Sequence, residues 1–451
     1  MRRLIVPLLA AAALPLAAAP LAIPHEMFRL RNGLTVIVHE DRSRPVVAVN
    51  LSYHVGSARE KPGRTGLAHL FEHIMFNGSK NVPMGAFDTW LEAVGGDNSG
   101  STSNDRTDYW QIVPSNAVET ALFLESDRMG WLLDTMTPER VNQQRDVVKN
   151  ERRQSYENQP YGMAEILIGE ALFPKDHPYH WPVIGYMEDL SAASDDDVKA
   201  FFRTWYGPAN ASLVLAGDID VPTARALVEK WFGDVPPSPR MPPPAAPPFV
   251  LNAEKRLVHE DEVDLPRLYL AWPTPPIYSP ADAALDAAAG VLAMGKNSRL
   301  YRTLVYEKAI AQDVSASQGS AALASTFEIV ATARKGHDLT EIYDVVMEEL
   351  ARLATEPPTP RELDRVKNRF ESEYFALLER LGGFSGRADL LNDYYVHTGN
   401  PGFVEGDLAR YRSLTPADVR AAVFSHLGPG RVVLSVVPRE KKPFAVGEVT
   451  R

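Results

Sequence analysis

Apolar side chains recur at every second position in two stretches near the beginning of the chain. Residues 34–38 are mostly apolar, and every odd-numbered position of 47–55 carries an apolar residue. A period of two is typical of a strand with one buried face, and residues 107–113 are predicted as a further strand. Residues 212–215 and 431–434 are short apolar runs of the length expected for buried strands. These stretches predict a sheet in each half of the chain.

A helical period separates the predicted strands. Apolar residues recur there at three- and four-residue steps, which predicts amphipathic helices. Strands at the ends of each half, around a block of helices, are typical of an α+β fold rather than an alternating parallel one. We therefore expect mainly antiparallel sheets with helices packed on one face of each. The predicted helices of the first half are 65–77, 84–94, 115–133, 138–157, 195–205 and 222–232.

A proline-rich segment, residues 235–250, divides the chain near its midpoint. Proline lacks a backbone N–H, so this segment is expected to be an extended linker rather than part of a sheet or helix. We predict one domain at 20–234 and a second at 251–451.

Three sequence features recur in the two halves in the same order and at a nearly constant separation. They are a Thr-Pro pair that begins a long helical pattern, an Asp-Val pair within a later helix, and a short apolar strand. A constant separation of this kind indicates an ancient tandem duplication, so the two domains are expected to be homologous. The paired positions are Thr137 and Thr359, Asp197 and Asp418, and Ser212 and Arg431.

Residues 1–19 have the pattern of a secretory signal peptide. Two arginines precede an apolar run from Leu4 to Leu16, and small residues follow to Ala19. The run is shorter than a membrane span and is interrupted by prolines. We expect cleavage near Ala19 and a periplasmic or secreted protein, with an uncleaved anchor or a buried first helix as alternatives. No later stretch is apolar enough to predict a membrane span.

Composition narrows the classes of function. Hydrophobic residues make up 45% of the chain and charged residues 23%, as in ordinary globular proteins. A net charge of −11 without a basic cluster argues against nucleic acid as a partner. The chain has no cysteine, so any metal site must be built from His, Asp or Glu.

The predicted helix 65–77 carries the pattern H-x-x-E-H at His69, Glu72 and His73. The two histidines lie four positions apart and share one helix face with Glu72, while apolar residues form a stripe on the other side. Two imidazoles and a nearby carboxylate suit a zinc site in which the histidines bind the metal and the glutamate handles protons. The alternative is a pair of surface histidines on an amphipathic helix.

A third ligand can be sought on the helix predicted at 138–157. Val141, Gln144 and Val148 form a buried stripe that continues to Glu151. A carboxylate on a buried face needs a partner, and a metal ion would supply one. The alternative partner is an arginine from the other half of the chain. Gln144, on the same face, is a candidate for contact with the ligands.

These motifs together resemble the pitrilysin-type inverzincin metallopeptidases, a family that includes the mitochondrial processing peptidases and insulin-degrading enzyme. The resemblance covers nearly all of the mature chain and includes the duplication. The segments that carry it are Gly66–His73, Gly95–Tyr109, Arg145–Arg153 and His177–Gly185.

The resemblance implies zinc held by His69, His73 and Glu151, with Glu72 as general base for hydrolysis of a peptide bond. It also implies that the substrate adds as a strand to a sheet edge, here the stretch 99–107. A second H-x-x-H, at His177 and His180, is expected to pack and hydrogen-bond rather than to bind a metal.

The sequence departs from the family pattern at three places. Ser99 stands where an asparagine is usual on the edge strand, with Asn98 as a possible substitute, and Gln144 stands where some members have an acid. In the C-terminal half, the positions of a substrate-binding Arg and Tyr are Val305 and Gln312. We therefore expect this chain to be the zinc-carrying subunit of a heterodimer whose homologous partner supplies the Arg and Tyr.

Several alternatives stay open. Tyr306 or Arg299 is an alternative source of the missing groups within this chain, and a homodimer of modest activity is another. Family members that only support assemblies suggest a non-catalytic scaffold subunit. A small-molecule lyase with the inverted motif is a third class, but such enzymes use a cysteine and a single domain.

Overall fold

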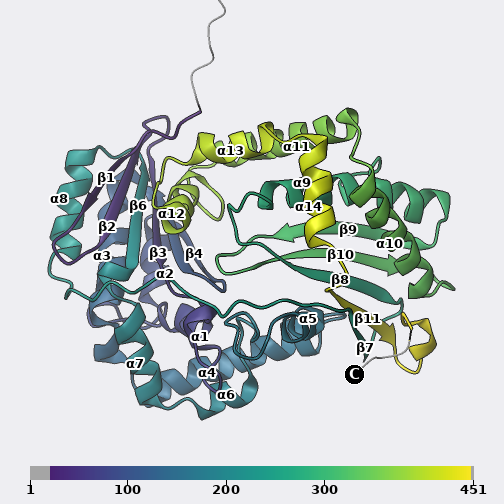
Figure 1. Cartoon of the computed structure of the whole chain (residues 1–451). Helices are drawn as coiled ribbons and strands as arrows, with labels where there is room; N and C mark the ends of the chain where they lie inside the picture. The colour runs from purple at the N-terminus through teal and green to yellow at the C-terminus, as the bar shows by residue number, and fades with distance from the viewer. Residues whose placement is uncertain (1–20, 448–451) are drawn as a thin grey trace, which may run out of the picture.

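The computed structural model describes residues 21–447, and its strands form two sheets that lie side by side (Figure 1). The predicted signal peptide lies outside the described residues. The first sheet contains β1 (Glu26–Arg29), β2 (Thr35–Glu40), β3 (Val46–Tyr53), β4 (Asp97–Thr102), β5 (Thr107–Pro114) and β6 (Ala211–Gly217). The second contains β7 (Lys255–Asp261), β8 (Arg267–Thr274), β9 (Ala311–Gly319), β10 (Ser325–Ala333) and β11 (Val432–Pro438).

The two sheets share one topology. Their strand orders are β1-β2-β6-β3-β5-β4 and β7-β11-β8-β10-β9, so the five strands after β1 correspond one to one. The pairs β2–β6 and β7–β11 are parallel, and all other neighbours are antiparallel. A repeated order with repeated directions confirms the duplication predicted from the sequence, and β1 is an addition of the first half.

The predicted helices of the first half are all present, and α7 has the predicted bounds. Thr137 caps α4 by accepting a hydrogen bond from the Arg140 N–H, and Pro138 occupies the first turn. Residues Arg153–Glu157 continue α4 as a π-helical turn. The helices of this half are α1 (Leu67–Ile74), α2 (Ala86–Ala93), α3 (Val118–Trp131), α4 (Pro138–Arg152), α5 (Ala164–Leu172), α6 (Met187–Ala192), α7 (Asp195–Trp205) and α8 (Val221–Phe232).

The second half repeats this helical block. Thr359, at the position that corresponds to Thr137, caps α11 by accepting a hydrogen bond from the Glu362 N–H, and the Glu362 carboxylate accepts one from the Thr359 N–H. A π-helical turn at Tyr301–Glu307 precedes β9. The helices are α9 (Asp282–Ala293), α10 (Leu339–Thr355), α11 (Pro360–Leu378), α12 (Arg387–Thr398), α13 (Val404–Arg412) and α14 (Pro416–His426).

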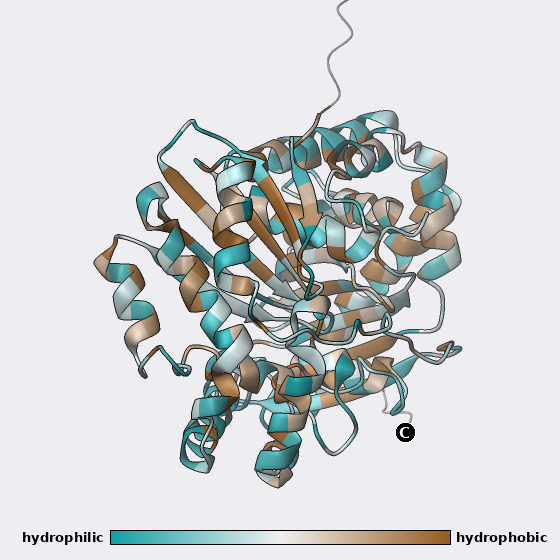
Figure 2. Ribbon diagram, turned by 90° about the vertical axis from the view of Figure 1, so that its left-hand side faces the viewer, coloured by the Kyte–Doolittle hydropathy of each residue, from teal (hydrophilic) through white to brown (hydrophobic). Residues whose placement is uncertain are grey.

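Each sheet buries one face under helices of its own half. Val47, Val49 and Leu51 of β3 point into the core beneath α1, α3 and α8, whereas Ala48 points to the opposite face. Figure 2 shows the strands as largely brown and the helices as mixed brown and teal, which is the pattern expected of a sheet covered on both sides by amphipathic helices.

The second face of each sheet is covered by a helix from the other half. Ala388, Leu391 and Tyr394 of α12 pack on the first sheet, and Ile168 and Leu172 of α5 pack on the second. The α+β class is confirmed, but the prediction of helices on one face only is incomplete. The sequence pattern could not reveal this exchange, because an amphipathic stripe does not say which sheet it covers.

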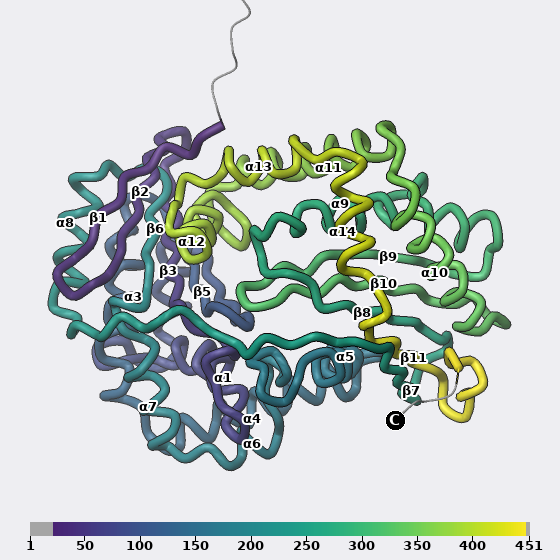
Figure 3. The backbone as a smooth tube through the Cα atoms, in the orientation of Figure 1, coloured from purple at the N-terminus to yellow at the C-terminus, as the bar shows by residue number. Residues whose placement is uncertain are grey.

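The proline-rich segment contains neither helix nor strand and runs from the first sheet to the second (Figure 3). The domain boundaries 20–234 and 251–451 stay a prediction, since α5 and α12 each cross to the other sheet. Among the described residues, no helix is long and apolar enough to cross a membrane.

Candidate metal centre

Buried polar groups fix the start of α1. Glu60 is buried and accepts hydrogen bonds from the N–H groups of Gly66 and Ala68, both at 2.8 Å. Burial raises the pKa of Glu60 to about 8, against the opposing effect of these N–H groups. Gly66 has φ 85°, and a Cβ there would lie 2.8 Å from the Ile184 carbonyl oxygen, so only glycine fits this entry to the helix. The Glu60 hydrogen bonds and the close contact at Gly66 therefore fix the position of α1, the helix that carries the two histidines.

The two faces of α1 divide as the sequence predicts. Leu67, Leu70, Phe71 and Ile74 are buried in the core of the first half. The H-x-x-E-H residues are not in that apolar core, and their side chains meet α4 and β4. The apolar stripe thus anchors the helix and leaves its polar face free for chemistry.

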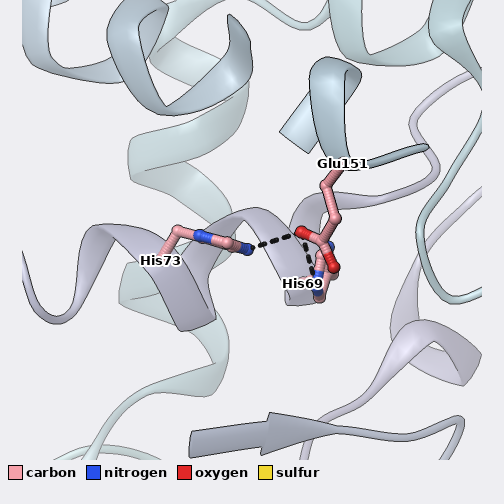
Figure 4. A group of neighbouring side chains, drawn as sticks. All are labelled: His69, His73 and Glu151. Carbon is pink, nitrogen blue, oxygen red and sulfur yellow. Dashed lines mark ion pairs between the residues drawn. The ribbon is translucent and has the colours of Figure 1, made fainter. Parts of the chain in front are cut away.

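Helix α4 brings Glu151 to the two histidines. Glu151 Oε2 lies 3.1 Å from His73 Nε2 and 3.8 Å from His69 Nε2 (Figure 4). One ligand atom from each residue lies within 4.8 Å of the others, and this is the only such group of His, Asp or Glu among residues 21–447. The alternative in which Glu151 pairs with an arginine is wrong, because the side chains next to its carboxylate are those of the two histidines.

The protonation states of these groups fit a metal ion. Burial lowers the pKa of His69 to about 4, which leaves its imidazole neutral. The approach of the His73 imidazole, at 3.1 Å, holds the pKa of Glu151 below its usual value, so Glu151 is a carboxylate. Glu151 Oε2 is nevertheless buried without a hydrogen bond of good geometry. Two imidazoles and a carboxylate with an open lone pair form a donor set that suits zinc and leaves a fourth position open.

Glu72 is held beside this group by the first sheet. The Thr102 hydroxyl of β4 donates a 2.6 Å hydrogen bond to Glu72 Oε2. Burial raises the pKa of Glu72, and the bond from Thr102 partly opposes the shift. A carboxylate with a raised pKa next to a metal-binding group is suited to taking and returning protons near neutral pH.

Strand β4 forms the outer edge of the first sheet and pairs only with β5 in the described part of the chain. It overlaps the predicted edge 99–107 and begins slightly earlier. Asn98 donates its amide to Asp88 Oδ1 of α2 at 3.2 Å, so it does not replace the amide missing at Ser99. The edge itself offers unpaired backbone groups next to Glu72, as the prediction requires.

Two residues that hold the site escaped the sequence analysis as functional positions. Thr102 lies in the segment Gly95–Tyr109, which resembles the family's edge strand. Its distance along the sequence from the H-x-x-E-H motif does not indicate a contact, which forms only when the sheet places β4 next to α1. Glu60 stands nine positions before His69, and no pattern in a single sequence marks it as a helix cap at that distance.

Other candidate residues lie elsewhere. His177 stacks on Phe173 and accepts a hydrogen bond from the Tyr179 N–H, and His180 bonds the Phe173 carbonyl. They pack as the sequence analysis expected. Gln144 is buried on α4, but no described hydrogen bond joins it to the ligands.

The C-terminal candidates are not equivalent to the missing Arg and Tyr. Val305 is buried in the second core and Gln312 is exposed on β9. Arg299 makes two hydrogen bonds with Glu362, at 2.7 and 3.1 Å, so it is already used by the helix cap of α11. Tyr306 is 57% exposed, and no described contact ties it to the metal centre.

Comparison with known proteins gives consistent matches. Residues 35–175 match the model described as insulinase (peptidase family M16), and residues 192–370 match the model described as the peptidase M16 inactive domain. The zinc protease PqqE of Helicobacter pylori is 29% identical over 389 residues, which cover 84% of this chain and 85% of the relative. The beta subunit of the mitochondrial-processing peptidase of Blastocladiella emersonii is 26% identical over 211 residues, 47% of this chain and 44% of the relative.

Solved structures agree with these matches. The crystal structure of a protease from Helicobacter pylori has a TM-score of 0.86 at 27% identity and covers 93% of this chain and 100% of its own. A peptidase M16 inactive-domain structure from Pseudomonas fluorescens has a TM-score of 0.80 at 20% identity, with 92% and 98% covered. The second similarity bears on the fold alone.

Proposed function

This chain belongs to the peptidase M16 family, and from that premise we propose that it is a zinc-dependent endopeptidase that cleaves peptides or unfolded segments. The observation that carries the proposal is the convergence of His69, His73 and Glu151 beside Glu72 and a free sheet edge. The intact donor set and base support a catalytic rather than a scaffold role, because a scaffold subunit would need neither.

The residues would divide the work in the following way. His69, His73 and Glu151 would hold the zinc ion, which supplies a Lewis acid for peptide hydrolysis when bound. Glu72 would accept a proton from water and return it to the leaving amine, while the Thr102 hydroxyl keeps one carboxylate oxygen fixed. The edge of β4 would orient the peptide through main-chain hydrogen bonds.

Metal removal and replacement test this proposal directly. The purified mature chain is expected to contain about one zinc ion and to cleave members of a peptide library. A chelator should abolish cleavage, and zinc should restore it. A scaffold subunit would show neither the metal nor the restored activity.

A cavity next to the metal centre supports a preference for basic peptides. It has a volume of about 750 Å³ and lies between the π-helical turn after Glu151, α5 and the second sheet. Glu165 of α5 and Glu328 of β10 both line it, and neither forms an ion pair among the described residues. Glu165 is exposed to solvent. Two unpaired acids in one cavity favour a cationic side chain as their partner.

We also propose that the chain works with a homologous subunit. Val305 has no hydrogen-bond donor in its side chain, Gln312 is uncharged and exposed on β9, and Arg299 is occupied by Glu362. Loss of an oxyanion donor typically costs roughly 10²–10³ in rate, so a chain with intact ligands gains from a partner that supplies the donors. The similarity to a processing-peptidase beta subunit is consistent with such a division.

Reconstitution tests the partnership. Hydrolysis by the chain alone should be weak and should rise by roughly 10²–10³ when a homologue with the Arg and Tyr but without H-x-x-E-H is added. Full activity of the isolated chain would show that no partner is needed. An equal rise on adding a homologue that lacks the Arg and Tyr would show that the partner does not act by supplying these two residues.

Export is a separate proposal, because it rests on the sequence of residues 1–19 alone. N-terminal sequencing of protein recovered from the periplasm or medium of a bacterial host should give a start at about Pro20. An exported form that keeps Met1 would contradict it.

A further inference from the structure

A second cavity, of about 220 Å³, lies where the first sheet, the proline-rich segment and α12 meet. It is separate from the candidate metal centre and from the 750 Å³ cavity lined by Glu165 and Glu328, called the acidic cavity below. The residues His69, Glu72, His73 and Glu151 do not line it, and of the predicted substrate edge 99–107 it includes Asp105. At the ~30 Å³ that a water occupies in the liquid, it has room for about seven waters. That space is enough for a small hydrated anion.

The lining is strongly cationic. Arg29 of β1, Arg59 of the short 3-10 turn Ser57–Arg59 and Arg240 of the proline-rich segment all face the cavity. None of these three arginines forms an ion pair within the part of the chain that the structure describes. Their hydrogen bonds go to neutral groups instead: Arg59 donates to the Pro242 carbonyl at 2.8 Å, and Arg29 donates to the Thr35 and Tyr395 hydroxyls.

A single carboxylate lines the cavity, and it is already engaged. Asp105 accepts hydrogen bonds from the Tyr179 hydroxyl at 2.5 Å and from the Ala322 N–H at 2.9 Å. His397 is paired with Asp393 at 3.4 Å. Three guanidinium groups therefore face one carboxylate, and the cavity keeps an excess of positive charge.

Arg59 bears most of the cost of this excess, because it is partly buried whereas Arg29 and Arg240 are exposed to solvent. Burial lowers the pKa of Arg59, which indicates that the surrounding protein disfavours its charge. Burial also lowers the pKa of His54 to about 4, and Arg240, Arg59 and His397 add to the shift. His54 thus lies at the cavity wall as a neutral imidazole, and its Nε2 is hydrogen-bonded to the Ser212 hydroxyl at 3.1 Å.

We infer that this cavity is a binding site for a phosphate-class oxyanion. Guanidinium groups bind phosphate through paired, charge-assisted hydrogen bonds, and a phosphate carries a charge of about −1.5 to −2 at neutral pH. That charge balances the excess at the cavity, whereas one carboxylate would leave part of it unpaired. The ligand would contact β1, the 3-10 turn, the proline-rich segment and α12, and would thereby join the two halves of the chain.

Calorimetric titration of the zinc-loaded full chain with inorganic phosphate, at constant ionic strength in chloride, tests the site. Wild-type protein should show saturable binding, and acetate should bind at least ~10-fold more weakly. Arg59→Ala and Arg240→Ala should each weaken phosphate binding by at least ~10-fold, since each removes a charge-assisted contact. Arg420→Ala removes an exposed arginine of α14 and should leave the affinity unchanged.

Two further measurements separate this site from the metal centre and from a folding defect. Glu151→Gln should retain the phosphate affinity, because the cavity does not include the ligands; loss of binding there would assign the phosphate to the metal centre and overturn the inference. Phosphate should raise the melting temperature of wild-type protein but not of Arg240→Ala, whose side chain is exposed. Absence of saturable binding in the wild type, or wild-type affinity in both arginine variants, would also overturn it.

Discussion

Helices α1 and α9 occupy equivalent places in the two halves, but only α1 carries chemistry. α1 packs against α4, α7 and β4, and α9 packs against the corresponding α11, α14 and β9. In α9 every residue except Asp286 is buried, and half of the residues are alanines. A Cβ on Gly290 would lie 2.6 Å from Val366 of α11, so this helix pair relies on a small residue for close contact. The duplicated arrangement thus serves packing alone in one half and presents candidate metal ligands in the other.

The same contrast holds for the third ligand. Glu373 stands as far beyond the helix cap Thr359 as Glu151 stands beyond Thr137, so the two glutamates occupy matching positions of the duplication. Glu373 is exposed and paired with Arg369 on its own helix. A carboxylate at the matching position is therefore not sufficient for a ligand, because α9 offers no histidines to meet it. The duplicated fold provides the same position for a metal site in both halves, but a site can form only where the side chains at that position are metal ligands.

Removal of the proposed base is expected to have the largest effect. Glu72→Gln keeps the shape of the side chain but cannot accept a proton, so peptide hydrolysis should fall by roughly 10²–10⁴. Zinc content should stay near one per chain, because the three ligands are unchanged. Elemental analysis and a peptide assay measure both quantities, and an active Glu72→Gln would refute the mechanism.

The matched glutamates give the next largest effect. Glu151→Gln should weaken zinc binding by more than the ~10–100-fold typical of a residue that only supports a ligand. Glu157→Gln, six positions later on an exposed turn, and Glu373→Gln, at the duplicated position, should keep wild-type affinity. Competition with a chromogenic chelator measures the affinity. Equal loss in Glu151→Gln and Glu157→Gln would show that the wrong carboxylate was chosen.

The sequence was sufficient to select the three side chains that converge as candidate ligands, because its signals are local. Four-residue spacing placed His69 and His73 on one face, and the stripe of α4 selected Glu151. The Thr102 contact and the exchange of α5 and α12 were not predictable, because each depends on how distant segments meet. The cationic cavity has the same origin, since its arginines come from three separate segments.

The exchanged helices differ in how they are held, and that difference gives a smaller effect. α5 packs on the second sheet through apolar residues, whereas Asn392 of α12 is buried and donates to the carbonyls of Asn50 and Ser212 at 3.3 and 3.1 Å. Asn392→Ala would leave these polar groups without partners and should destabilise the chain by roughly 3 kcal/mol. Chemical denaturation measures the change. If Asn392→Ala lowers the free energy of unfolding by less than the exposed Asn400→Ala does, the hydrogen bonds of Asn392 do not stabilise the docking of α12.

The smallest expected effect concerns the acidic cavity, where function and stability oppose each other. Burial raises the pKa of Glu328 to about 7, and the charge of Glu165 adds to the shift. The folded chain therefore binds the Glu328 proton more tightly than the unfolded chain does. The resulting stabilisation is fully present below about pH 4.5 and is lost as the pH rises through 7. Glu328→Gln should therefore be more stable than wild type by about 1–2 kcal/mol at pH 8, with little difference at pH 4.

The same substitution should weaken the use of basic substrates. If the cavity receives a cationic side chain, Glu328→Gln should lower kcat/KM for a peptide with a basic residue several-fold and leave that for the neutral analogue unchanged. Exposed Glu348→Gln on α10 is the matched control. A variant that gains stability at pH 8 but treats both peptides as wild type does would place the acid pair outside the substrate path. A variant that loses stability at pH 8 would mean that Glu328 has a cationic partner in the folded chain, so the cavity would not be available to a basic side chain of the substrate.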